Sequence, residues 1–174
     1  FINHWCRHLR EFDVINRRGF QAGVQSGELQ FAGYHQYNRA LCLFHLGTNL
    51  NELGTELEEL ARFGDRTRNQ HATDPIAAAS RVAADLRGET PTPGAFAPGA
   101  ANDLAFVHDL ETRNARPALC HYNVLKIQAL FLYGRSDLAE PLIQFVEAHL
   151  AYVPGHIAVA VHTFYASLVA VALA

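Results

Sequence analysis

The chain of 174 residues is 49% hydrophobic and 18% charged, which is typical of a folded globular protein and excludes an intrinsically disordered one. Its formal net charge of -3 provides no basic surface for nucleic acid or for an anionic membrane. We therefore expect one domain with a substantial core and no nucleic-acid partner.

The cysteines and the two ends of the chain indicate its setting. Cys6, Cys42 and Cys120 are odd in number, far apart and each within an apolar helical pattern, so we expect reduced, buried thiols in a cytoplasmic protein. The sequence has no methionine, and both of its ends fall inside helical patterns. These two features favour a fragment of a larger protein. We expect residues 1–174 to form a single helical-repeat domain. The sequence contains no signal-peptide pattern.

Residues 157–174 are the candidate for a membrane span. They are mostly apolar but barely reach the minimum length, and they include His162, Thr163 and Ser167 without a flanking cluster of Lys or Arg. We expect a buried helix here and no membrane partner.

Apolar residues recur at helical spacing through the first third of the chain. The spacing predicts a first helix over residues 3–25, and a second over 28–46 that is apolar on most of its surface and buried on more than one side. Gly47 ends the second helix. Asn49, followed by Glu52, resembles a capping box for a third helix over residues 50–63, which has one apolar stripe.

Asp74 and Pro75 are a typical helix start, with Asp as the cap and Pro at the first helical position. We place a fourth, Ala-rich helix from there to about Arg87. The Pro/Gly-rich segment 88–101 cannot continue this helix. It is expected to be either a mobile surface loop or an arm laid over a groove, with Phe96 as its anchor.

The second half of the chain echoes the first. The pattern predicts a short helix over 102–114, a largely apolar helix over 117–133, an amphipathic helix to about residue 150 and a last helix over 156–174. No segment alternates like a strand. The predicted fold is all-α, with irregular tetratricopeptide-like helical hairpins stacked as a short solenoid of about seven helices.

Motifs for nucleotide binding and catalysis are absent. The sequence contains no G-x-x-x-x-G-K-[ST], no G-x-G-x-x-G after a strand, and no kinase or nucleophile-elbow motif. We therefore expect no cofactor, no catalytic residue and no enzymatic activity in these residues.

The ten histidines are the main candidates for a metal site. His4 and His8 share a helix face at a spacing that suits a metal, but a zincin motif needs a Glu beside the first His. Cys120 and His121 could meet His149 or His156 only through folding. Packing or solvated histidines are the favoured interpretation, and no bound metal is expected.

Two groups of polar residues are candidates for acid-base sites. Glu52, Glu56, Glu58 and Glu59 fall on the polar face of one predicted helix, whereas Asp103, His108, Asp109 and Glu111 lie beside the Pro/Gly-rich segment. A catalytic pair needs an apolar pocket that separates the two pKa values, so a solvated face is the favoured interpretation of the first group.

Aromatic residues at helical spacing are explained by core packing. The members of this set that could also face a partner or a ligand are Tyr34, Tyr37, Phe44, Tyr122 and Phe131. We treat these five as the candidate site.

Four stretches resemble a known family: HWCRHLREF, GFQAGVQSGELQFAGYHQYN, LFHLGTNLNELGTELEEL and HTFYASLVAVALA. They resemble the helical region that follows the AAA-type ATPase module in very large bacterial signalling kinases, which also carry a serine/threonine-kinase-like domain and often a histidine kinase. The family has a more acidic run where this chain has residues 26–31, SGELQF. The resembling motifs are packing motifs, so the resemblance implies no catalytic residue.

The resemblance implies a cytoplasmic, non-catalytic scaffold that contacts the ATPase or kinase domains of its own polypeptide, or a protein partner. Stacked hairpins with uncovered ends should also self-associate. The alternative is a small-molecule sensor, with an apolar pocket lined by the five aromatic residues and covered by the Pro/Gly-rich segment. A metal-dependent helical-bundle enzyme that uses the histidines is the third hypothesis.

Overall fold

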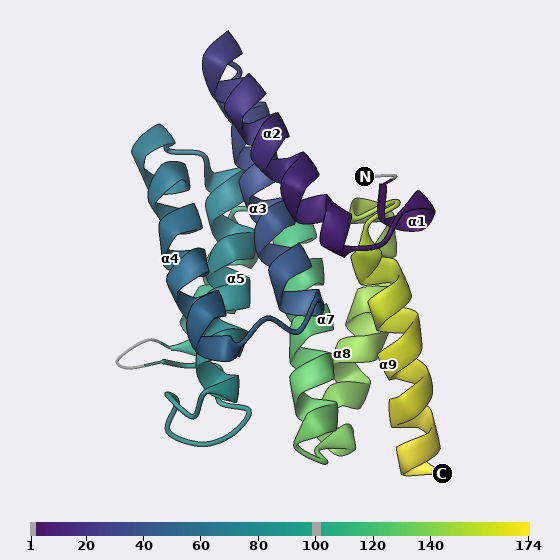
Figure 1. The fold of residues 1–174 in the computed structure, drawn as a ribbon. Coiled ribbons are helices and arrows are strands. Elements are labelled where there is room, and N and C mark those ends of the chain that lie inside the picture. Colours follow the sequence, from purple (N-terminus) through teal and green to yellow (C-terminus); the bar gives the residue numbers. More distant parts are fainter. Residues whose placement is uncertain (1–2, 99–101) are drawn as a thin grey trace. The chain divides into compact units, whose positions relative to one another are not determined.

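The computed structural model describes residues 3–98 and 102–174, and this part of the chain is all-α, as the sequence predicts (Figure 1). It contains nine α-helices and one short 3-10 helix, compared with about seven expected helices. The chain divides into two compact units, residues 1–83 and 84–174.

Helix α1 is a single turn that was expected to continue into the next helix. The expected first helix is split into α1 (Asn3–Cys6) and α2 (Arg10–Ser26). The imidazole Nδ1 of His8 accepts a hydrogen bond from the backbone N–H of Arg10 over 3.1 Å. This bond satisfies a first-turn donor of α2 that a continuous helix would have paired internally.

In the first unit, α3 lies between its two neighbours. Helix α2 packs on α3 (Leu29–His45), and α3 packs on α4 (Leu50–Thr67). Nine residues of α3 are buried, compared with five residues of α4, which lie along one stripe. The structure thereby confirms that the first hairpin helix is covered on several sides and that the second shows its back to water.

Close contact between α2 and α3 depends on Gly23. A Cβ atom at Gly23 would lie 3.0 Å from the backbone nitrogen of Ala32, which is shorter than ordinary van der Waals contact. Lower on the same interface, Asn16 Oδ1 and His35 Nδ1 lie 3.0 Å apart in a hydrogen bond. The interface is therefore set by a small residue at one level and by a polar pair at another.

The caps of α4 and α5 differ in how well the sequence predicts them. The Asn49 side chain accepts a hydrogen bond from Asn51 N–H, which confirms its role as the cap of α4. The predicted start at Asp74 is wrong, because α5 (Gln70–Leu86) begins one turn earlier. Asn69 accepts from the Ala72 N–H at the actual start, whereas the buried Asp74 accepts from the Gln70 side chain.

The second unit is built around one central helix. Its helices are α6 (Asp103–Thr112), α7 (Arg116–Leu132), α8 (Ser136–His149), the 3-10 helix Leu150–Tyr152 and α9 (Ile157–Leu173). Helix α7 packs against α6, α8 and α9, and most of its residues are buried. Figure 1 shows α7 beside α8 and α9. Gly134, at a φ of 70°, makes the turn between α7 and α8.

The Pro/Gly-rich segment is held to the end of α5. The Asp85 carboxylate accepts hydrogen bonds from the Thr90 hydroxyl and from the backbone N–H groups of Gly94 and Phe96. Phe96 is 1% exposed, so the prediction that it anchors the segment is confirmed. Residues 99–101 of the expected loop lie outside the described part of the chain.

The cysteine predictions are confirmed at two of three positions. Cys42 and Cys120 are buried and free, and burial raises the pKa of their thiols to about 12 and about 11. The expectation of a buried Cys6 is wrong, because α1 leaves Cys6 exposed.

No helix within residues 3–98 and 102–174 combines the length and apolar character that crossing a membrane requires. The expectation that the last helix is buried is wrong for much of its surface, because α9 buries Ala158, His162 and Val169 and leaves Phe164 and Val171 exposed.

Candidate functional site

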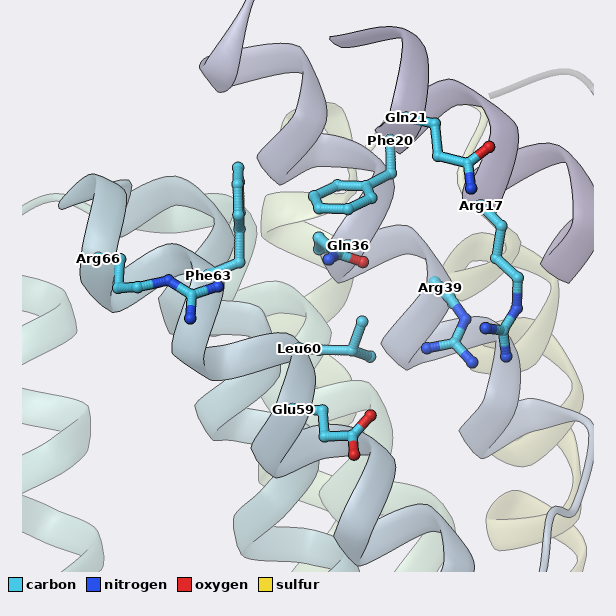
Figure 2. A pocket seen from close by; sticks show the side chains of 9 residues that line it. All are labelled: Arg17, Phe20, Gln21, Gln36, Arg39, Glu59, Leu60, Phe63 and Arg66. Carbon is cyan, nitrogen blue, oxygen red and sulfur yellow. The ribbon is translucent and has the colours of Figure 1, made fainter. Parts of the chain in front are cut away.

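A cleft of about 370 Å³ opens on the first unit between α2 and α4, with α3 at its base (Figure 2). Each of the three helices contributes lining residues that are three or four positions apart, because residues at this spacing share one helix face. The lining residues are Arg17, Phe20 and Gln21 from α2, Gln36 and Arg39 from α3, and Glu59, Leu60, Phe63 and Arg66 from α4.

A network of ion pairs closes one end of the cleft. Arg39 donates from Nε to Asp13 Oδ1 over 2.6 Å, and its Nη1 lies 2.8 Å from Glu56 Oε2. Arg17 donates from Nε to the other oxygen of Asp13 over 2.8 Å. Two residues of α2 therefore meet one residue each from α3 and α4 at this point, and the network ties the three helices together.

The network determines the protonation of its members. Burial disfavours the charged form of Asp13, but hydrogen bonds from Arg17 and Arg39 outweigh it and hold the pKa of this carboxyl below its usual value. Burial likewise disfavours the charged guanidinium of Arg39, and its hydrogen bonds to Glu56 and Asp13 raise its pKa above the usual value. Both groups are ionised at neutral pH.

Arg39 keeps one donor without an acceptor. Its side chain is 6% exposed, and its Nη2 atom is buried with no hydrogen-bond partner among the described residues. A buried polar atom without a partner costs roughly 1–3 kcal/mol relative to one that is paired. Arg39 is a lining residue, so an acceptor that reached this atom from the cleft, once the side chains covering the atom moved aside, would gain a hydrogen bond.

Aromatic rings lie at the other end of the cleft. The rings of Phe20 and Phe63 meet edge to face, with centroids 4.9 Å apart. Phe63 is buried and Phe20 is half-buried, and Leu60 continues the apolar surface on α4. The cleft therefore has Arg17 and Arg39 at one end and the aromatic pair at the other, with Arg66 beside Phe63 at the aromatic end (Figure 2).

Two further lining side chains are available for hydrogen bonding. The Gln36 amide, on the floor of the cleft, makes no hydrogen bond to another described residue, and neither does the exposed guanidinium of Arg66 at the rim. Figure 2 shows Gln36 between the aromatic pair and Arg39. Amide and guanidinium groups bind and orient a ligand, and no lining residue is a serine, threonine, cysteine, lysine or histidine.

The sequence did not single out these residues. Glu56 was assigned to a solvated face, but it is drawn to Arg39 and is only partly exposed. The signal for the site was Arg39 itself, since an arginine in the middle of an otherwise apolar, buried helix needs partners. Only folding shows that those partners come from α2 and α4.

The five predicted aromatic site residues lie elsewhere. Tyr34 and Tyr37 on α3 meet edge to face with centroids 6.0 Å apart, and burial raises the pKa of Tyr37 to about 12. Phe44 is buried near the end of the same helix. None of the three lines the cleft.

Tyr122 and Phe131 belong to α7 in the second unit. Tyr122 has no exposed surface, packs edge to face on Phe106, and donates a hydrogen bond from its hydroxyl to Asp103. Phe131 is half-buried, with its ring centroid 5.8 Å from that of Tyr165. Within this unit, both residues pack against neighbouring side chains.

The other polar groups weighed from the sequence form structural contacts. Asp103 also accepts from Lys126 over 2.7 Å, and Asp109 pairs with Arg113. The His121 and His156 rings lie 5.0 Å apart. Among the described residues, no three His, Cys, Asp or Glu side chains converge as metal ligands; the side chain of His4 lies outside that part.

Comparisons with protein-family models, with curated proteins and with solved structures found no significant match.

Proposed function

We propose that this chain is a non-catalytic helical-repeat module of a cytoplasmic signalling protein. In this role it mediates contacts with other domains of its own polypeptide, such as an ATPase or kinase domain, or with a separate protein partner. The cleft of the first unit is one binding surface of the module.

The unpartnered Nη2 atom of Arg39 is the observation that carries this proposal. It lies in a cleft lined by guanidinium, amide and aromatic groups, without a nucleophile paired with a base. Such a lining binds and orients, whereas covalent catalysis needs a nucleophile within hydrogen-bond reach of its activating base. The arrangement therefore supports recognition rather than bond making.

An exposed apolar stripe on α9 gives further support. Phe164 is 59% exposed and Val171 is 77% exposed, and Leu168 lies between them on the same helix face. Exposed apolar surface of this kind is typical of places where proteins meet other proteins.

A small-molecule sensor is the second candidate. It is favoured by the volume of the cleft, about 370 Å³, which falls within the roughly 300–1,000 Å³ of small-molecule sites. In this version the site is the polar cleft of the first unit, and the five aromatic residues predicted from the sequence do not form it.

The proposal is tested by selecting partners directly. A displayed library of random 12-residue peptides is panned against the whole chain and against a Gln21→Trp variant, whose exposed position at the rim lets the new ring fill the cleft. Arg62→Gln, at an exposed arginine of α4 outside the lining, is the matched control.

We expect selected peptides to bind the wild-type chain and the Arg62→Gln control equally, and to bind Gln21→Trp at least tenfold more weakly. Equal binding to all three proteins would show that the cleft is no contact surface. A library that yields no binder would count against the interaction role itself.

A further inference from the structure

We propose that the cleft of the first unit binds a ligand with one carboxylate joined by a short chain to an apolar group about the size of a phenyl ring. This inference rests on the proposed role of the cleft as a binding site and deepens it by naming the chemistry of the occupant.

The carboxylate end is assigned from Arg39. Its Nε and Nη1 atoms are taken by Asp13 and Glu56, so the guanidinium is held in one orientation and its Nη2 atom is the donor that remains. A charged donor fixed by two partners in this way forms its strongest hydrogen bond with an anionic oxygen.

The charges around the cleft are balanced, so the preference for an anion rests on the Nη2 atom of Arg39. Three arginines line the cleft, against one carboxylate, Glu59, and the Glu59 side chain stands at the exposed rim. The carboxylates of Asp13 and Glu56 lie outside the lining, where they hold Arg17 and Arg39. Counted together, three arginines therefore face three carboxylates, so a ligand carboxylate beside Arg39 depends on the Nη2 hydrogen bond and not on an excess of positive charge.

Gln36 supplies a donor for the second carboxylate oxygen. It lies three residues from Arg39 on the same face of α3, which is about 4.5 Å along the helix axis. Its amide makes no hydrogen bond to another described residue, so it is free to point into the cleft. Arg39 and Gln36 together would hold the two oxygens of one carboxylate.

The apolar end is assigned from Phe20 and Phe63. Phe20 lies three residues beyond Arg17 on α2, and Phe63 lies three residues beyond Leu60 on α4. The aromatic pair therefore stands roughly one to two helical turns, about 5–10 Å, from the guanidinium end. This separation sets the length of the chain that joins the two parts of the ligand.

Two sources supply this chemistry: a free aryl- or alkyl-carboxylate metabolite, and the C-terminal residue of a polypeptide that ends in an apolar side chain. They share the carboxylate and the apolar group. They differ in whether an amide-linked chain continues past the rim of the cleft.

The experiment is a calorimetric titration of the whole chain with four probes. The first two are 3-phenylpropanoate and its uncharged amide, which has the same shape. The other two are the acetylated peptide Gly-Gly-Gly-Phe with a free C-terminus and the same peptide with an amidated C-terminus. The proteins are wild type, Gln36→Leu, Gln21→Trp and the control Arg62→Gln, each checked for helicity and thermal stability.

We expect 3-phenylpropanoate to bind the wild type and Arg62→Gln with a dissociation constant of roughly 0.1–1 mM, as is usual for a ligand of this size. The uncharged amide should bind the wild type at least tenfold more weakly than 3-phenylpropanoate does. 3-Phenylpropanoate itself should bind Gln36→Leu and Gln21→Trp at least tenfold more weakly than it binds the wild type. Tighter binding of the free-ended peptide would identify a chain end as the source, and the reverse order would identify a metabolite.

Equal affinity for the acid and its amide, or no binding of any probe to the folded wild-type chain, would overturn the inference. If the titration overturns the inference but library peptides still bind Gln21→Trp more weakly than wild type, the proposed function stands. Failure of both would remove the cleft as a binding site.

Discussion

The carboxylate of Asp85 and the backbone amide of Phe96 are joined by a hydrogen bond of 3.0 Å, across a segment with two prolines and two glycines. Asp85 is 2% exposed and also accepts from Thr90 and Gly94. A composition that resembles a loose linker is thereby folded onto the end of α5, with Phe96 buried.

Asp85→Ala should release this segment. The substitution leaves three donors without their acceptor, which costs about 2–4 kcal/mol of unfolding free energy if each is partly replaced by water. We expect the amide protons of Gly94 and Phe96 to exchange with solvent at least tenfold faster, as measured by NMR. Asp137→Ala, at an exposed carboxylate of α8, is the control, and equal exchange in both variants would contradict the contact.

Gly23→Ala should weaken the interface between α2 and α3. Alanine favours a helix by about 1 kcal/mol over glycine, but its Cβ would lie 3.0 Å from the backbone of Ala32, so the two helices must move apart. We expect a net loss of about 1–2 kcal/mol in urea unfolding. Ala22→Ser, on the exposed face of the same helix, should change stability by less than about 0.5 kcal/mol. A Gly23→Ala protein at least as stable as wild type would show that the helices are not in close contact there.

The stability of the fold should fall as the pH drops from about 6.5 to 4. Burial lowers the pKa of His45 to about 4, and burial also lowers the pKa of His162. Between the unfolded pKa of His45, 6.5, and its folded pKa of about 4, the unfolded chain binds a proton that the folded chain does not. Unfolding therefore becomes easier as pH falls through this range. We expect the unfolding free energy of His45→Gln, measured in urea, to fall by about 1–3 kcal/mol less than that of wild type between pH 6.5 and pH 4. An unchanged slope would contradict the burial of His45.

Protonation of Asp13 should cause a second loss of folding stability, at lower pH than the loss caused by the histidines. Its pKa is lowered in the folded chain, so its contribution is complete above its unfolded value near 4 and is lost as pH falls through the lower, folded value. Asp13→Asn should therefore lower stability at pH 7 and have little effect in strong acid. The measurement is the same unfolding titration, and a loss of equal size at both pH values would show that the charge of Asp13 is not what matters.

The apolar stripe of α9 should drive self-association. Exposed Phe164 and Val171 would be buried in a contact between copies or with another protein. We expect the chain to gain mass with concentration in light scattering, and the double variant Phe164→Ser, Val171→Ser to remain monomeric. A monomeric wild type at high concentration would contradict this prediction.

Much of the fold follows from the sequence because helices depend on local pattern. The apolar surface of the second predicted helix indicated the burial of α3, and Asn49 indicated the cap of α4. The start of α5 did not follow, since Asp74 and Pro75 imitate a helix start while the buried Asp74 is bound by Gln70 inside the helix. A local motif cannot show which of two caps the packing selects.

The candidate site could not be predicted in the same way. Its key contacts join Asp13, Arg39 and Glu56, which are far apart in the sequence and come from three helices. The aromatic residues chosen from the sequence were prominent because they are large and regularly spaced, and the cleft is lined by other side chains. In the sequence, Tyr122 and Arg39 both stand within apolar helical patterns that predict burial. In the structure the Tyr122 hydroxyl has an acceptor, whereas the Nη2 atom of Arg39 has none.

The most direct test of the account is an NMR spectrum of the guanidinium groups in ¹⁵N-arginine-labelled protein, with Arg39 assigned by an Arg39→Lys variant. We predict that the Arg39 signals are protected from solvent and that they shift on addition of 3-phenylpropanoate, while those of the exposed Arg62 do not. Arg39 signals that exchange as fast as those of Arg62, or that ignore the carboxylate at saturating concentration, would contradict a binding site built on this residue.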